Sequence, residues 1–450
     1  MHKDPRTVIF FFRVYNDTDH LSPVAWKCLR EGWRVEIVLI DKNQSLDHDR
    51  DPRLALLRRF SNCRMYYYYS SAVGFGLFKK FSLARFRGPF ARKIIKIIFG
   101  FLNRHVFDAL WAENFIRLRR PAVCAFDFCE TSRDTLEGKL ITACKKWKVP
   151  LICLPHGAHF ITSYGEGSEQ FGGAKNEAYS ASRNLFDVIV EPNPCHEWTD
   201  WDKKLIERKK IVFLGSARYC PEWFSIARNF WPDFKPVKND TGRLKLIFFL
   251  PRWEGTVDKE GVLRALDALA ADPGIYLAVK EHTREGAGNL PREIDSKLAA
   301  SDNAELVRGS RVLPFNLWLS SLIKVKKKAG EVVDSVALVR WCDAAVNIRG
   351  SIGLEVVLQS KTLINPTYLH KGRTIFEDKG AGIECRNLSD LLLAVERCRV
   401  SKETPPLFYD SSALLKNSIY AGKEPVDVLS TYTELISTLQ RENDPGKGIS

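Results

Sequence analysis

Residues 349–355 read Arg-Gly-Ser-Ile-Gly-Leu-Glu, and they join a predicted strand over residues 343–348 to a predicted helix that begins at residue 354. A strand that turns at once into a helix leaves several backbone N–H groups without partners at the helix start. These donors, together with the partial positive charge of the helix terminus, suit a phosphate or a carboxylate. We expect Ser351 to cap the helix or bind that anion, and Glu355 to accept hydrogen bonds from ribose hydroxyls. The plainer alternative is a capped junction of the kind found in any α/β protein.

Strands and helices alternate on both sides of this motif. The other predicted strands of the second half are residues 244–250, 275–279, 305–308 and 361–366. Predicted helices over residues 261–271 and 334–341 lie between them. Such alternation predicts a parallel sheet covered by helices, which is a doubly wound domain.

Positively charged side chains follow three of these strands. Because the carboxyl ends of parallel strands meet at one edge of a sheet, we expect these side chains to crowd a single rim. With the helix start they would form a phosphate or diphosphate site. They are Arg252, Lys280, His282, Arg284 and Arg349. The alternative is that they are surface charges that happen to follow strands.

The first half opens with the same pattern. Residues 7–14 and 34–40 read as strands, and residues 21–31 read as the helix between them. A later predicted strand is followed at once by His156 and His159. Both histidines therefore lie where doubly wound sheets bind their ligands, beyond a strand's carboxyl end.

A chain of 450 residues is too long for one hydrophobic core, so we expect two domains. Residues 221–242, which contain several prolines, interrupt the alternation and read as a linker. The sequence thus predicts α/β architecture with two Rossmann-like parallel-sheet domains facing across a cleft, over residues 1–220 and 243–425. A final helix and tail would occupy residues 426–450.

The net charge of +14 is concentrated in one segment. Between residues 52 and 107 the chain carries twelve Lys and Arg and no Asp or Glu. Residues 90–107 have helical spacing with a wide apolar stripe and a cationic edge, which fits an anionic membrane surface. We expect residues 79–105 to hold the protein peripherally on the inner membrane. The alternatives are an ordinary helix with a solvated basic face and stacking on single-stranded nucleic acid; we expect no nucleic-acid partner.

No apolar run reaches the roughly 18 uncharged residues that a membrane span needs. The N-terminal residues do not form a convincing signal peptide. The eleven cysteines include no Cys-x-x-Cys pair, and several lie in apolar runs, as expected for reduced, packed thiols. These features predict a cytoplasmic protein without structural disulfides or zinc.

Three motifs resemble the GT-B superfamily, and within it the bacterial capsule and surface-polysaccharide biosynthesis proteins. Pro155-His156-Gly157 is similar to the His-Gly that follows a strand of their N-terminal domain. Lys280-Glu281-His282-Thr283 is similar to their Lys-x-His-Pro, and residues 350–355 with 360–362 are similar to their Ser-Ser-x-Gly-x-Glu and Gly-Lys-Pro. The resemblance covers about residues 120–385.

The resemblance implies a glycosyltransferase that moves a sugar from a nucleotide donor to a surface-polysaccharide or lipid-linked glycan. The C-terminal domain would hold the nucleotide, with Lys280 and His282 on the phosphates, N–H groups from Ser351 and Gly353, and Glu355 on a sugar or ribose. Cationic groups would stabilise the departing phosphate, so we expect neither a metal nor a cofactor. An inverting transfer would need a general base, for which we propose His156 first and Asp19 second.

Other functions stay open at this point. A polyol phosphotransferase that uses a CDP-activated donor, or a non-hydrolysing sugar-nucleotide epimerase, would have the same fold and the same basic strand ends. A scaffold or binding protein of a polysaccharide assembly complex is the non-enzymatic alternative.

Overall fold

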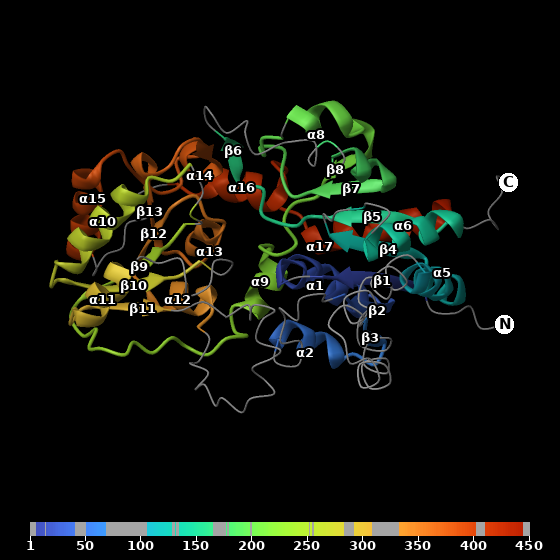
Figure 1. Cartoon of the computed structure of the whole chain (residues 1–450), viewed down its shortest axis with the longest axis horizontal. Helices are drawn as coiled ribbons and strands as arrows, with labels where there is room; N and C mark the ends of the chain where they lie inside the picture. The colour runs from blue at the N-terminus through green and yellow to red at the C-terminus, as the bar shows by residue number, and fades with distance from the viewer. Residues whose placement is uncertain are drawn as a thin grey trace, which may run out of the picture.

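The computed structural model describes residues 6–13, 15–40, 51–68, 106–127, 131, 135–164, 177, 180–198, 200–251, 253, 256–282, 292–307, 333–401 and 410–443. In this part of the chain two lobes lie side by side, and each contains one parallel sheet with helices packed on it (Figure 1). The predicted architecture of two doubly wound sheets is therefore confirmed. The predicted membrane segment at 79–105 and two predicted rim residues, Arg252 and Arg284, lie outside the described residues.

The N-terminal lobe contains a seven-stranded sheet in the order β3-β2-β1-β4-β5-β7-β8, with every neighbouring pair parallel. Its strands are β1 (Thr7–Phe12), β2 (Arg34–Leu39), β3 (Cys63–Tyr67), β4 (Val123–Asp127), β5 (Leu151–Leu154), β7 (Val188–Glu191) and β8 (Ile211–Phe213). Its helices include α1 (Tyr15–Arg30), α2 (Pro52–Arg58), α5 (Asp108–Arg119), α6 (Leu136–Lys146) and α8 (Asp200–Leu205). The central strands are continuous apolar runs because helices cover both of their faces. The strand order reverses at β1, so the carboxyl ends of β1 and β4 border the position where such sheets bind ligands.

Helix α1 differs from the sequence prediction at its start. We predicted a polar loop before a helix at residue 21, but the helix begins at Tyr15. The carboxylate of Asp17 accepts a hydrogen bond of 2.6 Å from the backbone N–H of Arg13, which satisfies one donor at the helix start. Asp17 and Asp19 thus lie on the first turns of a helix, and their positions are fixed.

The C-terminal lobe contains a six-stranded parallel sheet in the order β11-β10-β9-β12-β13-β15. Its strands are β9 (Leu244–Phe249), β10 (Ile275–Lys280), β11 (Ala304–Val307), β12 (Ala344–Asn347), β13 (Thr362–Pro366) and β15 (Ile383–Cys385). Its helices include α10 (Lys259–Ala270), α11 (Arg292–Ala300), α12 (Ser335–Trp341), α13 (Ile352–Leu358), α14 (Ile375–Asp378) and α15 (Leu388–Val400). Here the order reverses at β9, which lies between β10 and β12. The motif at residues 349–355 follows β12 and therefore lies at this lobe's own ligand position.

Several segments connect the lobes. Helix α9 (Pro221–Ala227) lies between them within the stretch that we predicted as a linker (Figure 1). A two-stranded antiparallel sheet pairs β6 (Ile161–Ser163), which follows β5 of the N-terminal lobe, with β14 (Arg373–Thr374), which follows β13 of the C-terminal lobe. Among the described residues, no helix is both long enough and apolar enough to cross a membrane.

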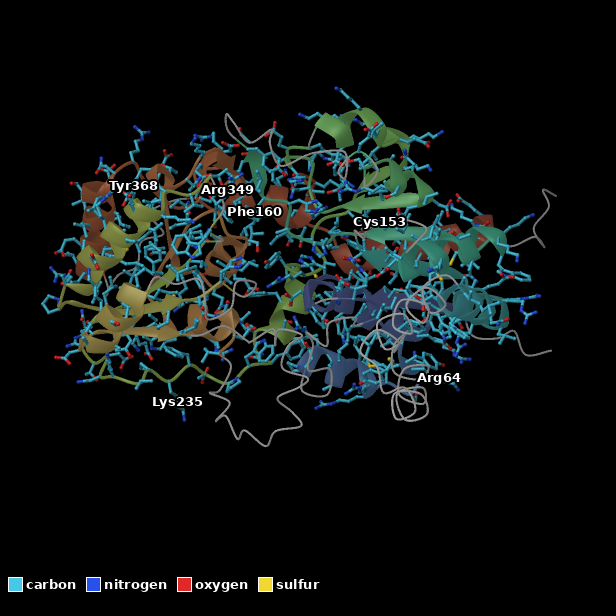
Figure 2. The ribbon with its side chains drawn as sticks, in the orientation of Figure 1. Arg64, Cys153, Phe160, Lys235, Arg349 and Tyr368 are labelled. Atoms are coloured by element: carbon cyan, nitrogen blue, oxygen red, sulfur yellow. The ribbon has the colours of Figure 1, made fainter. Side chains whose placement is uncertain are left out.

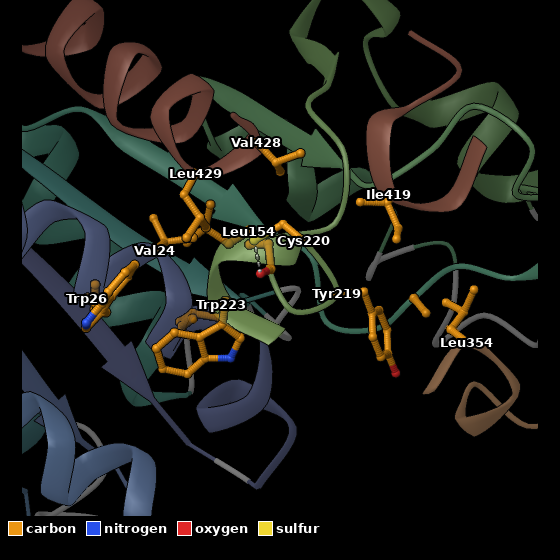
Figure 3. Close-up of a cluster of buried hydrophobic side chains, with 14 of the residues drawn as sticks. Val24, Trp26, Leu154, Tyr219, Cys220, Trp223, Leu354, Ile419, Val428 and Leu429 are labelled. Carbon is orange, nitrogen blue, oxygen red and sulfur yellow. Dashed lines mark hydrogen bonds between the residues drawn. The ribbon is translucent and has the colours of Figure 1, made fainter. Parts of the chain in front are cut away.

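The C-terminal segment returns to the first lobe. Helix α16 (Ser412–Tyr420) leads to α17 (Val428–Glu442), which packs on α1. Apolar side chains from α1, α9, α16 and α17 meet in one buried cluster with Trp223 at its centre (Figure 3). Backbone bonds fix the junction, since the N–H of Ser216 donates to the carbonyl of Ile419 at 3.0 Å and the hydroxyl of Tyr432 donates to the carbonyl of Gly215 at 2.8 Å.

Replacing Gly215 with Ala is expected to destabilise this junction. Gly215 has φ +90°, and a Cβ there would lie 2.1 Å from the carbonyl oxygen of Ile419. Strain at positive φ alone costs about 1 kcal/mol or more, and the backbone clash adds to it, so we expect a loss of at least about 2 kcal/mol in the free energy of unfolding. Gly32→Ala is the matched control, because Gly32 has φ +83° but open space around it. Urea unfolding of both variants measures the difference; equal losses would contradict the tight approach of α16.

Candidate active site between the lobes

Arg13, Asp17, Asp127 and His156 form a cluster beyond the carboxyl ends of β1, β4 and β5. Asp127 ends β4, is fully buried, and accepts from Arg13 Nε at 2.9 Å and from Arg13 Nη2 at 2.5 Å. His156 Nδ1 lies 2.7 Å from Asp127 Oδ2 and 3.6 Å from Asp17 Oδ1. The side chain of His156 is 29% exposed, whereas both carboxylates are fully buried, so the imidazole is the group that faces outward.

The cluster shifts the pKa values of its members in different directions. Burial and the neighbouring charge of Asp127 raise the pKa of Asp17 to about 7. Burial opposes ionisation of Asp127 too, but Arg13 and His156 stabilise its charge and hold its pKa below the ordinary value. Burial would lower the pKa of His156, yet hydrogen bonds to Asp127 and Asp17 overcome this and raise the pKa to about 9. At neutral pH His156 is therefore protonated, which does not suit the general-base role that we predicted for it.

The same residues include a possible cation site. Ligand atoms of Asp17, Asp127 and His156 all lie within 4.8 Å of one another. However, the guanidinium of Arg13 already contacts both oxygens of Asp127 and supplies the positive charge that a metal would bring. Asp17 and Asp19 also form an Asp-x-Asp triplet, but the carboxylate of Asp19 pairs with two arginines elsewhere. Metal independence stays a prediction.

Asp19 and Glu355, which come from different lobes, are joined by Arg218. The guanidinium of Arg218 lies 2.9 Å from Asp19 Oδ2 and 3.2 Å from Glu355 Oε1, and Arg53 also pairs with Asp19. Burial raises the pKa of Glu355 to about 7, although Arg218 opposes the shift. The residue predicted as second candidate base and the residue predicted for the ribose are thus tied into one ion-pair chain across the lobes.

At the rim of the C-terminal lobe, the carboxyl ends of neighbouring parallel strands lie side by side. Lys280 of β10 and Asn347 of β12 both lie in register with Phe249 of β9, so these ends are side by side. Lys280 is only 3% exposed, and its Nζ donates to the carbonyl of Glu281 at 3.2 Å. Burial lowers the pKa of Lys280 to about 8, even though Asp334 and Glu281 favour its charge. His282 follows at the same strand end and is half-buried.

Within the motif, the structure places each predicted residue after β12. Arg349 has φ +52°, and its guanidinium donates to Thr256 Oγ1 at 3.2 Å. Ser351 occupies the N-cap position of α13 without a side-chain capping bond. The N–H of Gly353 donates to the carbonyl of Gly350 at 3.2 Å, and a Cβ at Gly353 would lie 2.7 Å from Phe376. Close packing therefore explains this glycine, while its predicted contact with phosphate stays a prediction.

The segment after β5 crosses to this motif. We call residues 156–164 and 347–355 together the interlobe seam. The N–H of Ile375 donates to the carbonyl of Phe160 at 2.8 Å, and the ring of Phe160 lies 6.1 Å from that of Phe376, the ring that packs on Gly353. Phe160 and Arg349 are both labelled in Figure 2.

A second contact joins the two sides of the seam. The guanidinium of Arg349 lies over the ring of Tyr164, 5.8 Å from its centroid. Burial lowers the pKa of His20, and the nearby charges of Arg218, His156 and His159 lower it further. Arg218, Arg349 and the segment around Phe160 thus link site residues of the two lobes.

Sequence reasoning missed Arg13, Asp17, Asp127 and Arg218. Arg13 and Asp127 are 114 positions apart, and only the adjacency of β1 and β4 brings them together. The available signal was positional: Arg13 lies at the end of the strand predicted over residues 7–14, and Asp17 follows that strand closely. Nothing in the local sequence around Arg218 distinguishes it from other surface arginines.

No family model matches the sequence, and no curated protein matches it. Several solved structures are similar to the chain. A structure described as a putative UDP-N-acetylglucosamine 2-epimerase from Listeria monocytogenes is 10% identical, with a TM-score of 0.55, over 99% of this chain and 100% of that one. The UDP-GlcNAc 2-epimerase from Neisseria meningitidis, bound to UDP-GlcNAc, is 13% identical, with a TM-score of 0.51, over 97% and 100%. The chain has the GT-B fold.

A third structure agrees over the full length. UDP-N-acetylglucosamine 2-epimerase from Rickettsia bellii is 12% identical, with a TM-score of 0.51, and the match covers 98% of this chain and 99% of that one. At such low identity the likeness concerns the GT-B fold alone. It nevertheless extends over both lobes, so the seam of this chain lies between the two halves of a complete GT-B structure.

Proposed function

We propose that the chain is a glycosyltransferase that uses a nucleotide sugar and extends a surface-polysaccharide or lipid-linked glycan. One observation carries this proposal: the segments that follow β5 and β12 meet at the seam, and the strand ends of the two lobes carry complementary chemistry. The N-terminal lobe presents His156 above two buried carboxylates, and the C-terminal lobe presents Lys280 and Arg349. A diphosphate between them would meet cations from both lobes.

Lys280 supports the donor assignment most strongly. Burying an ammonium group is unfavourable unless it is paired. The hydrogen bond of Lys280 is with the neutral carbonyl of Glu281, and the charges of Asp334 and Glu281 only partly offset the burial, since the pKa of Lys280 stays lowered. A phosphate of the donor would provide the opposite charge. His282, Arg349 and the N-cap residue Ser351 would add hydrogen bonds to the same group, as the sequence analysis predicted.

The protonated His156 would act on the leaving group. As the bond between the anomeric carbon and the phosphate oxygen breaks, negative charge develops on the departing nucleotide. An imidazolium held by Asp127 and Asp17 could stabilise that charge by a hydrogen bond, without a change in its own protonation. The role differs from the base that we predicted, because the two carboxylates keep the ring charged.

A sugar-nucleotide epimerase is the second candidate, and it is favoured by the similarity to structures of UDP-N-acetylglucosamine 2-epimerases. The two activities differ in whether they need an acceptor. An epimerase converts a nucleotide sugar without any acceptor, whereas a transferase releases the nucleotide only when an acceptor or water takes the sugar.

A thermal-shift screen followed by product analysis tests the proposal. The screen uses UDP, CMP, CDP and GDP with their sugars; a ligand at one hundred times its Kd stabilises the fold by about 2.7 kcal/mol. We expect at least one nucleotide to raise the Tm of the wild type, and His282→Ala and Ser351→Ala to weaken this effect. Lys297→Ala, at an exposed position on α11, is the control and should respond like the wild type.

The stabilising sugar nucleotide is then incubated alone and with a polysaccharide or lipid-linked acceptor. Nucleotide release that depends on the acceptor is the expected result. An epimeric nucleotide sugar formed without acceptor would establish the second candidate instead. Absence of any thermal shift would contradict both enzymes and favour the scaffold.

A further inference from the structure

His159 and Glu191 form a second histidine–carboxylate pair on the N-terminal side of the seam. Glu191 ends β7, is 2% exposed, and its Oε2 forms a hydrogen bond with His159 Nδ1. The side chain of His159 is 14% exposed. This pair is separate from the cluster of Asp127 and His156, although both pairs influence the buried ring of His20.

The backbone at His159 is held in an unusual conformation. His159 has φ +49°, in the left-handed region that residues other than glycine seldom adopt. The buried side chain of Asn193 donates to the carbonyl of Ala158 at 3.1 Å and to that of His159 at 3.0 Å. Such strain persists only where the surroundings fix it, and it is concentrated at functional sites. Here it sets the direction in which the imidazole points.

Two further contacts fix the ring itself. An ionised carboxylate can only accept a hydrogen bond, so the contact with Glu191 places a proton on Nδ1 and leaves Nε2 as the ring nitrogen that does not face Glu191. The ring of His196 lies 4.6 Å away at an interplanar angle of 31°, and its Nδ1 is 3.2 Å from the carbonyl of Ile161. Burial lowers the pKa of His196 to about 3, so this neighbour is neutral. Glu191 and the ring of His196 thus both contact the imidazole of His159.

We propose that His159 is the general base of the transfer and that Glu191 is its positioning residue. This inference rests on the proposed function. The environment of His156 differs, because two carboxylates lie next to that ring and the guanidinium of Arg13 contacts one of them, Asp127. His159 also immediately precedes Phe160, whose carbonyl and ring contact the C-terminal lobe beside the motif.

In the proposed step, an acceptor oxygen replaces the nucleotide on the anomeric carbon of the sugar. An acceptor hydroxyl loses its proton to His159 Nε2 while its oxygen forms a bond to the anomeric carbon. The bond between that carbon and the phosphate oxygen breaks, and its electron pair leaves with the nucleotide, next to His156 and Lys280. The proton on His159 then passes to solvent. Two imidazoles three residues apart would thus serve opposite ends of one displacement.

The reactivity of the ring tests the proposal without any substrate. Diethyl pyrocarbonate transfers its ethoxycarbonyl group to a neutral imidazole nitrogen, and mass spectrometry of peptides identifies which histidine reacted. At neutral pH we expect His159 in the wild type to react faster than His156, His20 and His196, and Glu191→Gln to slow it. An unreactive His159 beside a rapidly modified His156, or a rate that Glu191→Gln does not change, would overturn the proposal.

Kinetics separate this inference from the function on which it rests. With the sugar nucleotide that shows acceptor-dependent release, His159→Gln should lower kcat roughly 10²- to 10⁴-fold and leave nucleotide binding unchanged. Glu191→Asp, which keeps the carboxylate, should retain more activity than Glu191→Gln at equal Tm. A His159→Gln enzyme with the wild-type kcat would overturn the base assignment while leaving the transferase in place. If the wild type turns over no sugar nucleotide, the proposed function fails, and the modification rates still decide whether His159 and Glu191 form a reactive pair.

Discussion

Replacing Asp127 with Asn is expected to lower the rate of transfer at least ~100-fold, which is the lower end of the range for loss of one hydrogen-bond donor that stabilises charge in the transition state. Asp127 is fully buried and carries the charge that both Arg13 and His156 contact. A neutral amide cannot stabilise the imidazolium in the same way. Burial, which already opposes the charge on His156, would then lower the pKa of that ring from about 9.

The pH dependence of activity shows in which direction the pKa of His156 moves when Asp127 is replaced. In the wild type, activity that needs protonated His156 should be present at neutral pH and fall as pH rises through about 9. In Asp127→Asn the fall should occur at lower pH, so the loss is greatest at alkaline pH. Profiles of kcat/KM against pH for both enzymes measure the displacement. Superimposable profiles would show that Asp127 does not hold the charge of His156.

The same substitution should reduce stability. Removing one partner of a buried ion pair typically costs about 3–5 kcal/mol, because the remaining charge is left without compensation. Arg13 makes three hydrogen bonds to the Asp127 carboxylate and would keep only those that the single amide oxygen of Asn can accept. Asp267→Asn is a matched control, since Asp267 and Lys297 form an exposed pair whose loss should cost at most about 1 kcal/mol.

Replacing Lys280 with Met should stabilise the protein and abolish donor binding. The pKa of Lys280 falls from 10.5 to about 8 on folding, so below both values the buried charge opposes folding by roughly 3 kcal/mol. Methionine fills a similar volume without charge. We therefore expect a higher free energy of unfolding at pH 7 and a much weaker response to nucleotide, since a cation of the diphosphate site is lost.

Measurements of the free energy of unfolding at several pH values test whether the charge of Lys280 opposes folding. Between pH 8 and pH 10.5 the unfolded chain binds the proton more tightly than the folded one, so this group makes the wild type more stable as pH rises. The advantage of Lys280→Met should shrink over the same interval. Urea unfolding at several pH values measures both enzymes. A variant that is less stable than the wild type at pH 7 and still binds nucleotide normally would contradict the role of Lys280.

The fold was largely predictable because it depends on local patterns. Apolar runs that end in polar or glycine-containing turns identified the strands around the motif at 349–355, and alternation with helices indicated parallel sheets. The start of α1 was mispredicted because its first turn is polar, and the capping bond from Arg13 to Asp17 depends on a residue outside the helix. Patterns of hydrophobicity do not report such bonds.

Site residues were predictable only where their position after a single predicted strand was enough to identify them. His156, Lys280 and His282 were recognised because each directly follows a predicted strand. Arg218 was not, because its importance comes from Asp19 and Glu355, which are 199 and 137 positions away. The protonation of His156 was also out of reach, since it depends on two carboxylates that topology alone brings beside the ring.

Hydrogen–deuterium exchange in the presence of nucleotide examines whether both lobes contribute to one site. With whichever of UDP, CMP, CDP or GDP raises the Tm, we expect amide protection to increase together in residues 156–164 and 344–358, on the two sides of the seam. Protection confined to one lobe, or located away from these segments, would show that the seam is not a nucleotide-sugar site.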